Sequence, residues 1–219
     1  MSEKQSILDL KWSREAQQKR GGKTQTALLD ATESLILEKG PEGFSMQDVA
    51  KKAGSSIGSL YHHFKDKEAL NNALFARMVR ELEQTYEAAL DPQRWQDAGV
   101  LDIIRGFTHA SFHPQDETAN PHLAGKLSAG SDPELAHMHN MVRKTFFEGL
   151  RELLLSRRDE IGHPQPEMAI AVVLDLVGPL WRSWRIPEEQ EMLMCRDRPG
   201  QLEEEVVSMA AAYLRIPDA

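Results

Sequence analysis

The sequence is poor in cysteine and in long apolar runs. Cys195 is the only cysteine, so no disulfide can form within the chain, which argues against a secreted, disulfide-stabilised scaffold. The longest apolar run, Met168 to Leu174, is too short to span a bilayer. Charges interrupt the apolar side chains of residues 1–22, which therefore fit neither a signal peptide nor a membrane span. We expect a cytoplasmic protein without a membrane partner.

Signatures of catalysis and of bound cofactors are also missing. The sequence has no Gly-rich phosphate loop and no nucleophile elbow. His109 and His113 are four residues apart, a spacing that can share a metal ion, and His137 and His139 lie on the next long predicted helix. Because no carboxylate or cysteine completes a recognisable ligand set, we interpret these histidines as solvated or hydrogen-bonded. We expect no metal, no cofactor and no enzymatic activity, although catalytic carboxylates scattered over helices would leave no signature.

Strand patterns are nearly absent, and helical periodicity predicts an all-α fold. With 219 residues and 41% hydrophobic content, the chain can bury a core without disulfides or metal. Ser45, Asp66 and Asp132 are good helix N-caps. The predicted helices span residues 24–39, 46–53, 56–63, 67–90, 98–112, 121–129, 133 to about 161, 166–184 and 201–214.

Charge is distributed unevenly along the chain. The net charge is -8, which by itself disfavours a nucleic-acid partner. Residues 1–70 contain 11 basic and 10 acidic side chains, whereas residues 71–219 contain 15 basic and 24 acidic ones. The acidity therefore belongs to the second part, and a near-neutral DNA-reading head remains possible.

Residues 45–64 have the pattern of a helix-turn-helix. Val49 and Ala50 give the first helix an apolar face, Gly54 permits a sharp turn, and Leu60 with Phe64 anchors the second helix. The outer face of the second helix carries small or hydrogen-bonding groups, namely Ser55, Ser56, Ile57, Ser59 and His62, while Gly58 allows close approach to a sugar-phosphate chain. A plain helical hairpin that binds another protein is the alternative interpretation.

The region from Gly40 to Leu70 resembles the amino-terminal head of the tetracycline-repressor (TetR) family. The resemblance lies in the glycines, in a Leu-Tyr-x-x-Phe sequence that ends the second helix and in a Lys-Glu-x-Leu sequence that starts the next one. The matching residues are Gly40, Phe44, Ser45, Val49, Ala50, Ala53, Gly54, Ser56, Gly58, Leu60, Tyr61, Phe64, Lys67, Glu68 and Leu70. It covers about residues 23–75. Ser55 and Ile57 depart from the residues that the family usually has at these positions, so an unusual sequence preference is expected.

The resemblance implies roles for single residues in contacts with operator DNA. Ser45 and Gln47 would contact backbone or bases, and Ile57, Gly58 and Ser59 would face bases. Tyr61, His62 and Lys67 would contact phosphates. Tyr61 as a packed core residue is the alternative.

A dimer is expected from the apolar carboxy-terminal helices. The segment Met168 to Trp181 is apolar on almost every side and needs a second cover, for which another subunit is the simplest candidate. Burial within one domain is the alternative. The resemblance implies that the last two long helices form the dimer bundle, and the predicted interface comprises Leu174, Val177, Leu180, Val206, Met209, Ala210 and Tyr213.

An effector pocket is implied by the resemblance alone. Its candidate residues are large and apolar with one possible anion partner: Arg105, Phe107, His109, Phe112, Met141, Phe146 and Trp181. Core packing would explain most of them equally well.

The predicted organisation is an extension at 1–22, a helix-turn-helix domain at 23–68, and a helical effector-binding and dimerisation domain at 69–219. The extension is basic and forms either a DNA arm or a tail, with Gly21 and Gly22 as a hinge. We expect a homodimeric, ligand-responsive regulator, with double-stranded operator DNA and an unidentified small molecule as partners. The same head serves repressors and activators, and repression is the expectation.

Overall fold

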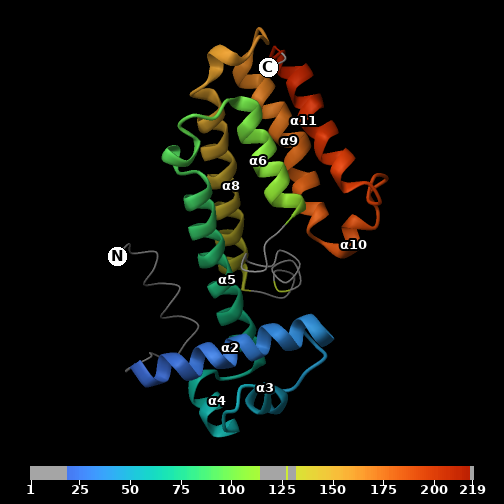
Figure 1. Ribbon diagram of the computed structural model, residues 1–219. Helices are drawn as coiled ribbons and strands as arrows, with labels where there is room; N and C mark the ends of the chain where they lie inside the picture. Colours follow the sequence, from blue (N-terminus) through green and yellow to red (C-terminus); the bar gives the residue numbers. More distant parts are fainter. Residues whose placement is uncertain (1–18, 114–126, 128–131, 218–219) are drawn as a thin grey trace. The chain divides into compact units, whose positions relative to one another are not determined.

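The computed structural model describes residues 19–113, 127 and 132–217, and all regular structure in that part is helical (Figure 1). The predicted all-α class is confirmed. The α-helices are α2 (Lys19–Lys39), α3 (Met46–Lys52), α4 (Ile57–His63), α5 (Lys67–Ala89), α6 (Val100–Phe112), α8 (Pro133–Leu155), α9 (Pro166–Trp184), α10 (Pro187–Gln190) and α11 (Pro199–Leu214). Two 3-10 helices, η1 (Pro92–Trp95) and η2 (Arg158–Glu160), complete the set. None of the described helices is both long and apolar enough to cross a membrane.

Two predicted boundaries are wrong. α2 begins at Lys19, so the glycine pair 21–22 continues the helix and is no hinge. The helix that was predicted to run to about residue 161 ends at Leu155. The Arg157 guanidinium explains this end, because it donates to the Leu153 carbonyl at 3.0 Å, to the Ala98 carbonyl at 2.6 Å and to the Trp95 carbonyl. These bonds satisfy a carbonyl of the last turn and tie it to the segment before α6. The helix predicted at 121–129 falls almost entirely outside the described residues.

Contacts divide the chain into two compact units. The first unit, called the head below, comprises residues 1–81 and 123–140, and the second unit comprises residues 82–122 and 141–219. α5 and α8 each contribute one end to the head and the other to the second unit. By contact, residues 69–81 therefore pack with the head, although the predicted domain division falls after residue 68.

The head packs α2, α3, α4 and the first half of α5 around a small apolar core. Its fully buried side chains include Leu28, Ile36, Val49, Leu60, Phe64, Leu70, Leu74 and Phe75. Phe44, in the loop after α2, is 6% exposed and closes this core. The apolar residues predicted to anchor α3 and α4, namely Val49 and Ala50 and then Leu60 and Phe64, are thus buried.

The second unit is built on three mutually packed helices, α6, α9 and α11, which lie side by side in Figure 1. Aromatic side chains join them to α8 and α5, since Phe107 of α6 lies 5.5 Å from Phe146 of α8 and Tyr86 of α5 stacks on Phe146 with ring centroids 4.0 Å apart. Gly178 allows α9 to approach α8 closely, because a Cβ there would lie 2.8 Å from the Phe147 ring. The unit therefore has its own continuous core, in which Val100, Ile103, Leu150, Val173 and Leu214 are at most 1% exposed.

Candidate DNA-binding surface

The bracing helix α3 has well-defined ends. Ser45 caps it by a capping box, in which the Ser45 hydroxyl accepts from the Asp48 N–H at 3.2 Å and the Asp48 carboxylate accepts from the Ser45 N–H at 2.8 Å. The backbone and hydroxyl hydrogen bonds from Ser45 lower the pKa of Asp48. At the other end the Ser55 N–H donates to the Ala50 carbonyl at 2.9 Å across Gly54, whose φ is 62°. This Schellman geometry needs a left-handed residue, which explains the glycine.

The second helix, α4, is anchored on one face and open on the other. Ser56 caps it by accepting from the Ser59 N–H at 3.1 Å, and Leu60, His63 and Phe64 are buried below. Burial lowers the pKa of His63, and the neighbouring His62 adds to this effect, so the fold favours the neutral form of His63.

The predicted DNA contacts lie on the open face or beside it. Ser45, Gln47, Ser56, Ile57, Gly58, Tyr61 and His62 are exposed, while Ser55, Ser59 and Lys67 are partly exposed. Tyr61 is 48% exposed, so the alternative of a packed core residue is wrong. The open face is available to a duplex, and the individual contacts stay predictions.

Lys67 has a structural role that its position in the sequence did not reveal. Its ammonium donates to the Phe44 carbonyl at 3.0 Å and lies 4.4 Å from the centroid of the Phe44 ring. The ammonium is also 3.5 Å from the Glu42 carboxylate. Lys67 therefore ties the start of α5 to the loop between α2 and α3, whether or not it also meets a phosphate.

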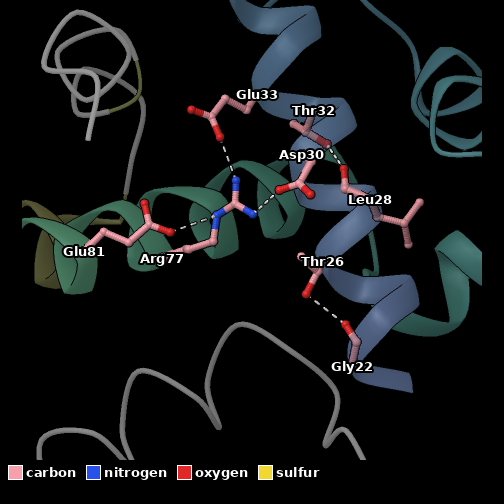
Figure 2. A network of polar contacts seen from close by, with 8 residues as sticks. All are labelled: Gly22, Thr26, Leu28, Asp30, Thr32, Glu33, Arg77 and Glu81. Atoms are coloured by element: carbon pink, nitrogen blue, oxygen red, sulfur yellow. Dashed lines mark hydrogen bonds and ion pairs between the residues drawn. The ribbon is translucent and has the colours of Figure 1, made fainter. Parts of the chain in front are cut away.

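A second cation, Arg77, fixes α5 against α2. Figure 2 shows its guanidinium reaching from α5 to two carboxylates of α2, with 2.5 Å to Asp30 and 2.7 Å to Glu33. Glu81 lies 3.7 Å from the Arg77 Nε, and burial raises the pKa of this carboxyl group although Arg77 acts in the opposite direction. Arg77 is 16% exposed, so these interactions are partly shielded from water. No local motif indicates the network, because its members lie 44 and 47 residues apart.

The residues predicted for an effector pocket fall into two groups. Phe107, Phe112, Phe146 and Trp181 are at most 8% exposed and belong to the core of the second unit. Arg105, His109 and Met141 are exposed on the surface. Arg105 pairs with Asp102 at 3.3 Å. The structure thus brings the aromatic members together and leaves the three polar or flexible members outside.

The residues predicted for the dimer interface divide in the same way. Leu174, Val177, Val206 and Ala210 are at most 6% exposed, because α6, α9 and α11 already cover them within one chain. Met209 and Tyr213 are 44% and 40% exposed, and Leu180 is half-buried. Met168 and Leu176 of α9 are more exposed still, at 59% and 60%. We refer to these five side chains together as the α9–α11 face.

The histidine pair at the C-terminal end of α6 has a partner that the sequence pattern did not indicate. Glu203 of α11 lies 2.9 Å from the His109 Nδ1 and 3.2 Å from the His113 Nε2. The carboxylate is 94 and 90 residues away in the sequence, so only the packing of α6 against α11 places it there.

An exposed helix supported by a bracing helix, within a described part of the chain that is all-helical, is the architecture of a helix-turn-helix DNA-binding head. Residues 28–74 match the family described as "Bacterial regulatory proteins, tetR family".

Among similar proteins, the transcriptional regulator BetI of Cronobacter sakazakii is 29% identical over 157 residues, which cover 70% of this chain and 75% of BetI. The regulator EthR of Mycolicibacterium smegmatis is 25% identical over 195 residues, covering 86% of this chain and 82% of EthR. In fold, the chain resembles NalD, the secondary repressor of the MexAB-OprM multidrug efflux pump in Pseudomonas aeruginosa. The TM-score is 0.59 at 21% identity, and the match covers 92% of this chain and all of NalD. The match to residues 28–74 and these similarities together support a regulator of the TetR type.

Proposed function

We propose that this chain is a cytoplasmic homodimeric repressor that occupies a palindromic operator and is released by a small molecule bound in the second unit. The observation that carries the proposal is the open face of α4, where Ile57 and Tyr61 are 40% and 48% exposed although both are large and apolar or aromatic. The helix α4 has seven residues, and the family that its region matches consists of regulatory proteins. Large exposed side chains on such a helix suit contacts with bases in a major groove.

On this face we assign base contacts to Ile57, Gly58 and Ser59. An isoleucine side chain donates no hydrogen bond, so a thymine methyl group is its expected base partner. Tyr61 and His62 are assigned to phosphates, because their polar groups stand at the exposed end of α4. Ser45 and Gln47 at the start of α3 would contact the adjacent backbone or bases.

A pair of hydroxyl-removing variants tests the DNA surface. Tyr61→Phe removes one exposed hydroxyl from α4, and Thr145→Val removes one from an exposed position of α8, which is assigned neither to DNA nor to the dimer. An operator is first selected from a random DNA pool, and its affinity for each protein is measured at several salt concentrations. We expect Tyr61→Phe to bind about tenfold more weakly, the loss of roughly one hydrogen bond to a charged group, while Thr145→Val binds like the unchanged protein. Equal affinity for Tyr61→Phe would remove this assignment, and binding without salt dependence would favour the protein-binding hairpin.

The homodimer is proposed to form through the α9–α11 face. Two-fold symmetry would place this face against its own copy, and an exposed apolar stripe on two neighbouring helices suits such a self-complementary contact. Because four of the predicted interface residues are already buried within one chain, we assign the contact to Met168, Leu176, Leu180, Met209 and Tyr213. Two heads held in this way would read two half-sites separated by about one helical turn of DNA or a multiple of it.

Charge substitution on this face tests the dimer. Leu176→Glu and Met209→Glu place carboxylates on exposed positions of α9 and α11, so the fold of one chain should persist while the dimer dissociates. Met194→Glu is the control, since Met194 is 96% exposed and lies outside both helices. Sedimentation velocity should show monomers for the first two variants and dimers for the control. Dimers in all three would place the interface elsewhere.

The effector is proposed to bind among the aromatic side chains of the second unit. Phe107 lies 5.5 Å from Phe146 and 6.3 Å from Trp181 between ring centroids, so entry of a ligand would displace at least one ring. Arg185 suits the role of the anion partner better than the exposed Arg105. Burial lowers the pKa of the Arg185 guanidinium, and the nearby Tyr86 acts in the opposite direction.

This assignment favours a flat effector with an acidic group. In a thermal-shift assay, aromatic carboxylates and their neutral amides should change the unfolding temperature of the unchanged protein by different amounts. The difference should vanish in Arg185→Gln and persist in Arg105→Gln. If only Arg105→Gln abolished the difference, Arg105 and not Arg185 would be the anion partner. To release DNA, the effector must prefer the non-binding arrangement by about 1–3 kcal/mol.

A further inference from the structure

Three potential metal ligands from two helices converge on one point of the second unit. His109 lies in the last turn of α6, His113 is the residue that caps the end of that helix, and Glu203 lies in the first turns of α11. One carboxylate oxygen lies 2.9 Å from the His109 Nδ1, and the other lies 3.2 Å from the His113 Nε2. The donor atoms of the three residues all lie within 4.8 Å of one another.

These distances are close to those of a tetrahedral metal site. Zinc binds imidazole nitrogen and carboxylate oxygen at about 2.0–2.1 Å, which separates neighbouring ligand atoms by about 3.4 Å. The two observed separations are shorter by only a few tenths of an ångström, so small side-chain rotations suffice to admit an ion. The imidazole rings already stand close together, with centroids 4.5 Å apart.

The site has a fixed side and an open side. Glu203 is 15% exposed, whereas the His109 and His113 side chains are 64% and 50% exposed. The carboxylate is held by the packing of α11 against α6, where Phe112 and Ala210 are buried in the same core. The exposed imidazoles leave room for water to complete the coordination.

The donor set selects the class of ion. Two imidazole nitrogens favour zinc, nickel or copper, whereas calcium and magnesium prefer oxygen ligands alone. The net charge of residues 71–219, with 15 basic and 24 acidic side chains, also attracts cations to this part of the chain.

We propose that His109, His113 and Glu203 bind one divalent transition-metal ion, with zinc as the representative, and that the ion cross-links α6 to α11. The sequence pattern had favoured solvated or hydrogen-bonded histidines because no carboxylate or cysteine completed a recognisable ligand set. Glu203 supplies the missing ligand. The proposal does not depend on the DNA-binding function, because it concerns residues of the second unit alone.

Zinc binding by the full-length, tag-free chain tests the proposal. After dialysis against a chelator, zinc is titrated in competition with a chromophoric indicator. We compare the unchanged protein with His109→Ala, His113→Ala and Glu203→Gln. His137→Ala is the control, because His137 is an exposed histidine on α8 that lies outside the cluster. Cobalt(II) in place of zinc adds a visible absorption spectrum that reports the ligand geometry.

We expect one zinc ion per chain, at least about tenfold weaker binding in each of the three variants, and unchanged binding in His137→Ala. Zinc should raise the unfolding temperature of the unchanged protein and of the control only, which distinguishes lost binding from lost folding. Less than one equivalent of zinc in the unchanged protein would overturn the proposal. So would equal affinity in the cluster variants and the control, since that would indicate binding to scattered surface histidines.

Discussion

Replacing Gly58 by alanine separates the stability of α4 from its affinity for DNA. An added Cβ at this exposed position would meet only the Ser56 Oγ, at 3.9 Å, which is an ordinary contact. Alanine also loses less backbone entropy than glycine when a helix forms. We therefore expect Gly58→Ala to raise the free energy of unfolding of the head by roughly 0.5 kcal/mol, or about 2–4 °C in its melting temperature.

The same methyl group should weaken DNA binding. If α4 lies in the major groove with its Gly58 backbone close to the bases, the methyl group occupies space that the duplex needs. Such overpacking costs about 1–3 kcal/mol, which corresponds to about 5- to 150-fold in dissociation constant for each bound head. Fluorescence anisotropy with the selected operator measures the affinity, and thermal unfolding measures the stability.

Gly200→Ala is the matched control. Gly200 is exposed at the start of α11, and a Cβ there would meet nothing within 4 Å. This variant should gain stability without losing affinity. A Gly58→Ala protein that is folded and binds the operator as tightly as the unchanged protein would refute the placement of α4. A destabilised Gly58→Ala protein would refute the packing argument instead.

Three further predictions concern the stability of the head. Lys67→Met removes the donor to the Phe44 carbonyl and should lower the free energy of unfolding by about 1–2 kcal/mol in chemical denaturation, whereas Lys65→Met, an exposed neighbour, should change it little. Arg77→Met leaves two carboxylates of α2 without their cation and should lower the free energy of unfolding by about 2–3 kcal/mol, somewhat below the range for fully buried pairs. A decrease of less than about 0.5 kcal/mol would contradict the network. Burial lowers the pKa of His63 below its ordinary 6.5, so the unfolded chain binds this proton more readily, and stability should be fully present above pH 6.5 and fall as the pH drops towards the folded-state pKa. The free energies of unfolding measured at pH 5 and at pH 7.5 should differ less for His63→Gln than for the unchanged protein.

Local signals in the sequence predicted most of the head. The Ser45 cap and the left-handed Gly54 are decided by neighbours within five residues, and both were predicted from residue type. The apolar spacing of Leu60 and Phe64 likewise identified the buried face of α4 before any contact was known. The helix-turn-helix could therefore be predicted because its geometry depends on short-range rules.

Other features were beyond the reach of local signals. The double role of Lys67 and the Arg77 network join residues 23, 44 and 47 positions apart, and no spacing rule connects such positions. The glycine pair near residue 21 was predicted as a hinge, yet α2 runs through it, because glycine disfavours a helix by only about 1 kcal/mol and its context can override this.

By itself, the sequence determined the all-helical class, the head motif and the apolar character of α9 and α11. Only the tertiary structure decided which apolar side chains face inward, burying Leu174 and Val206 while leaving Leu176 and Met209 at the surface. It also brought Glu203 to the histidines of α6. The physical reason is that periodicity records how residues are arranged around one helix, whereas burial and convergence depend on which helices pack together.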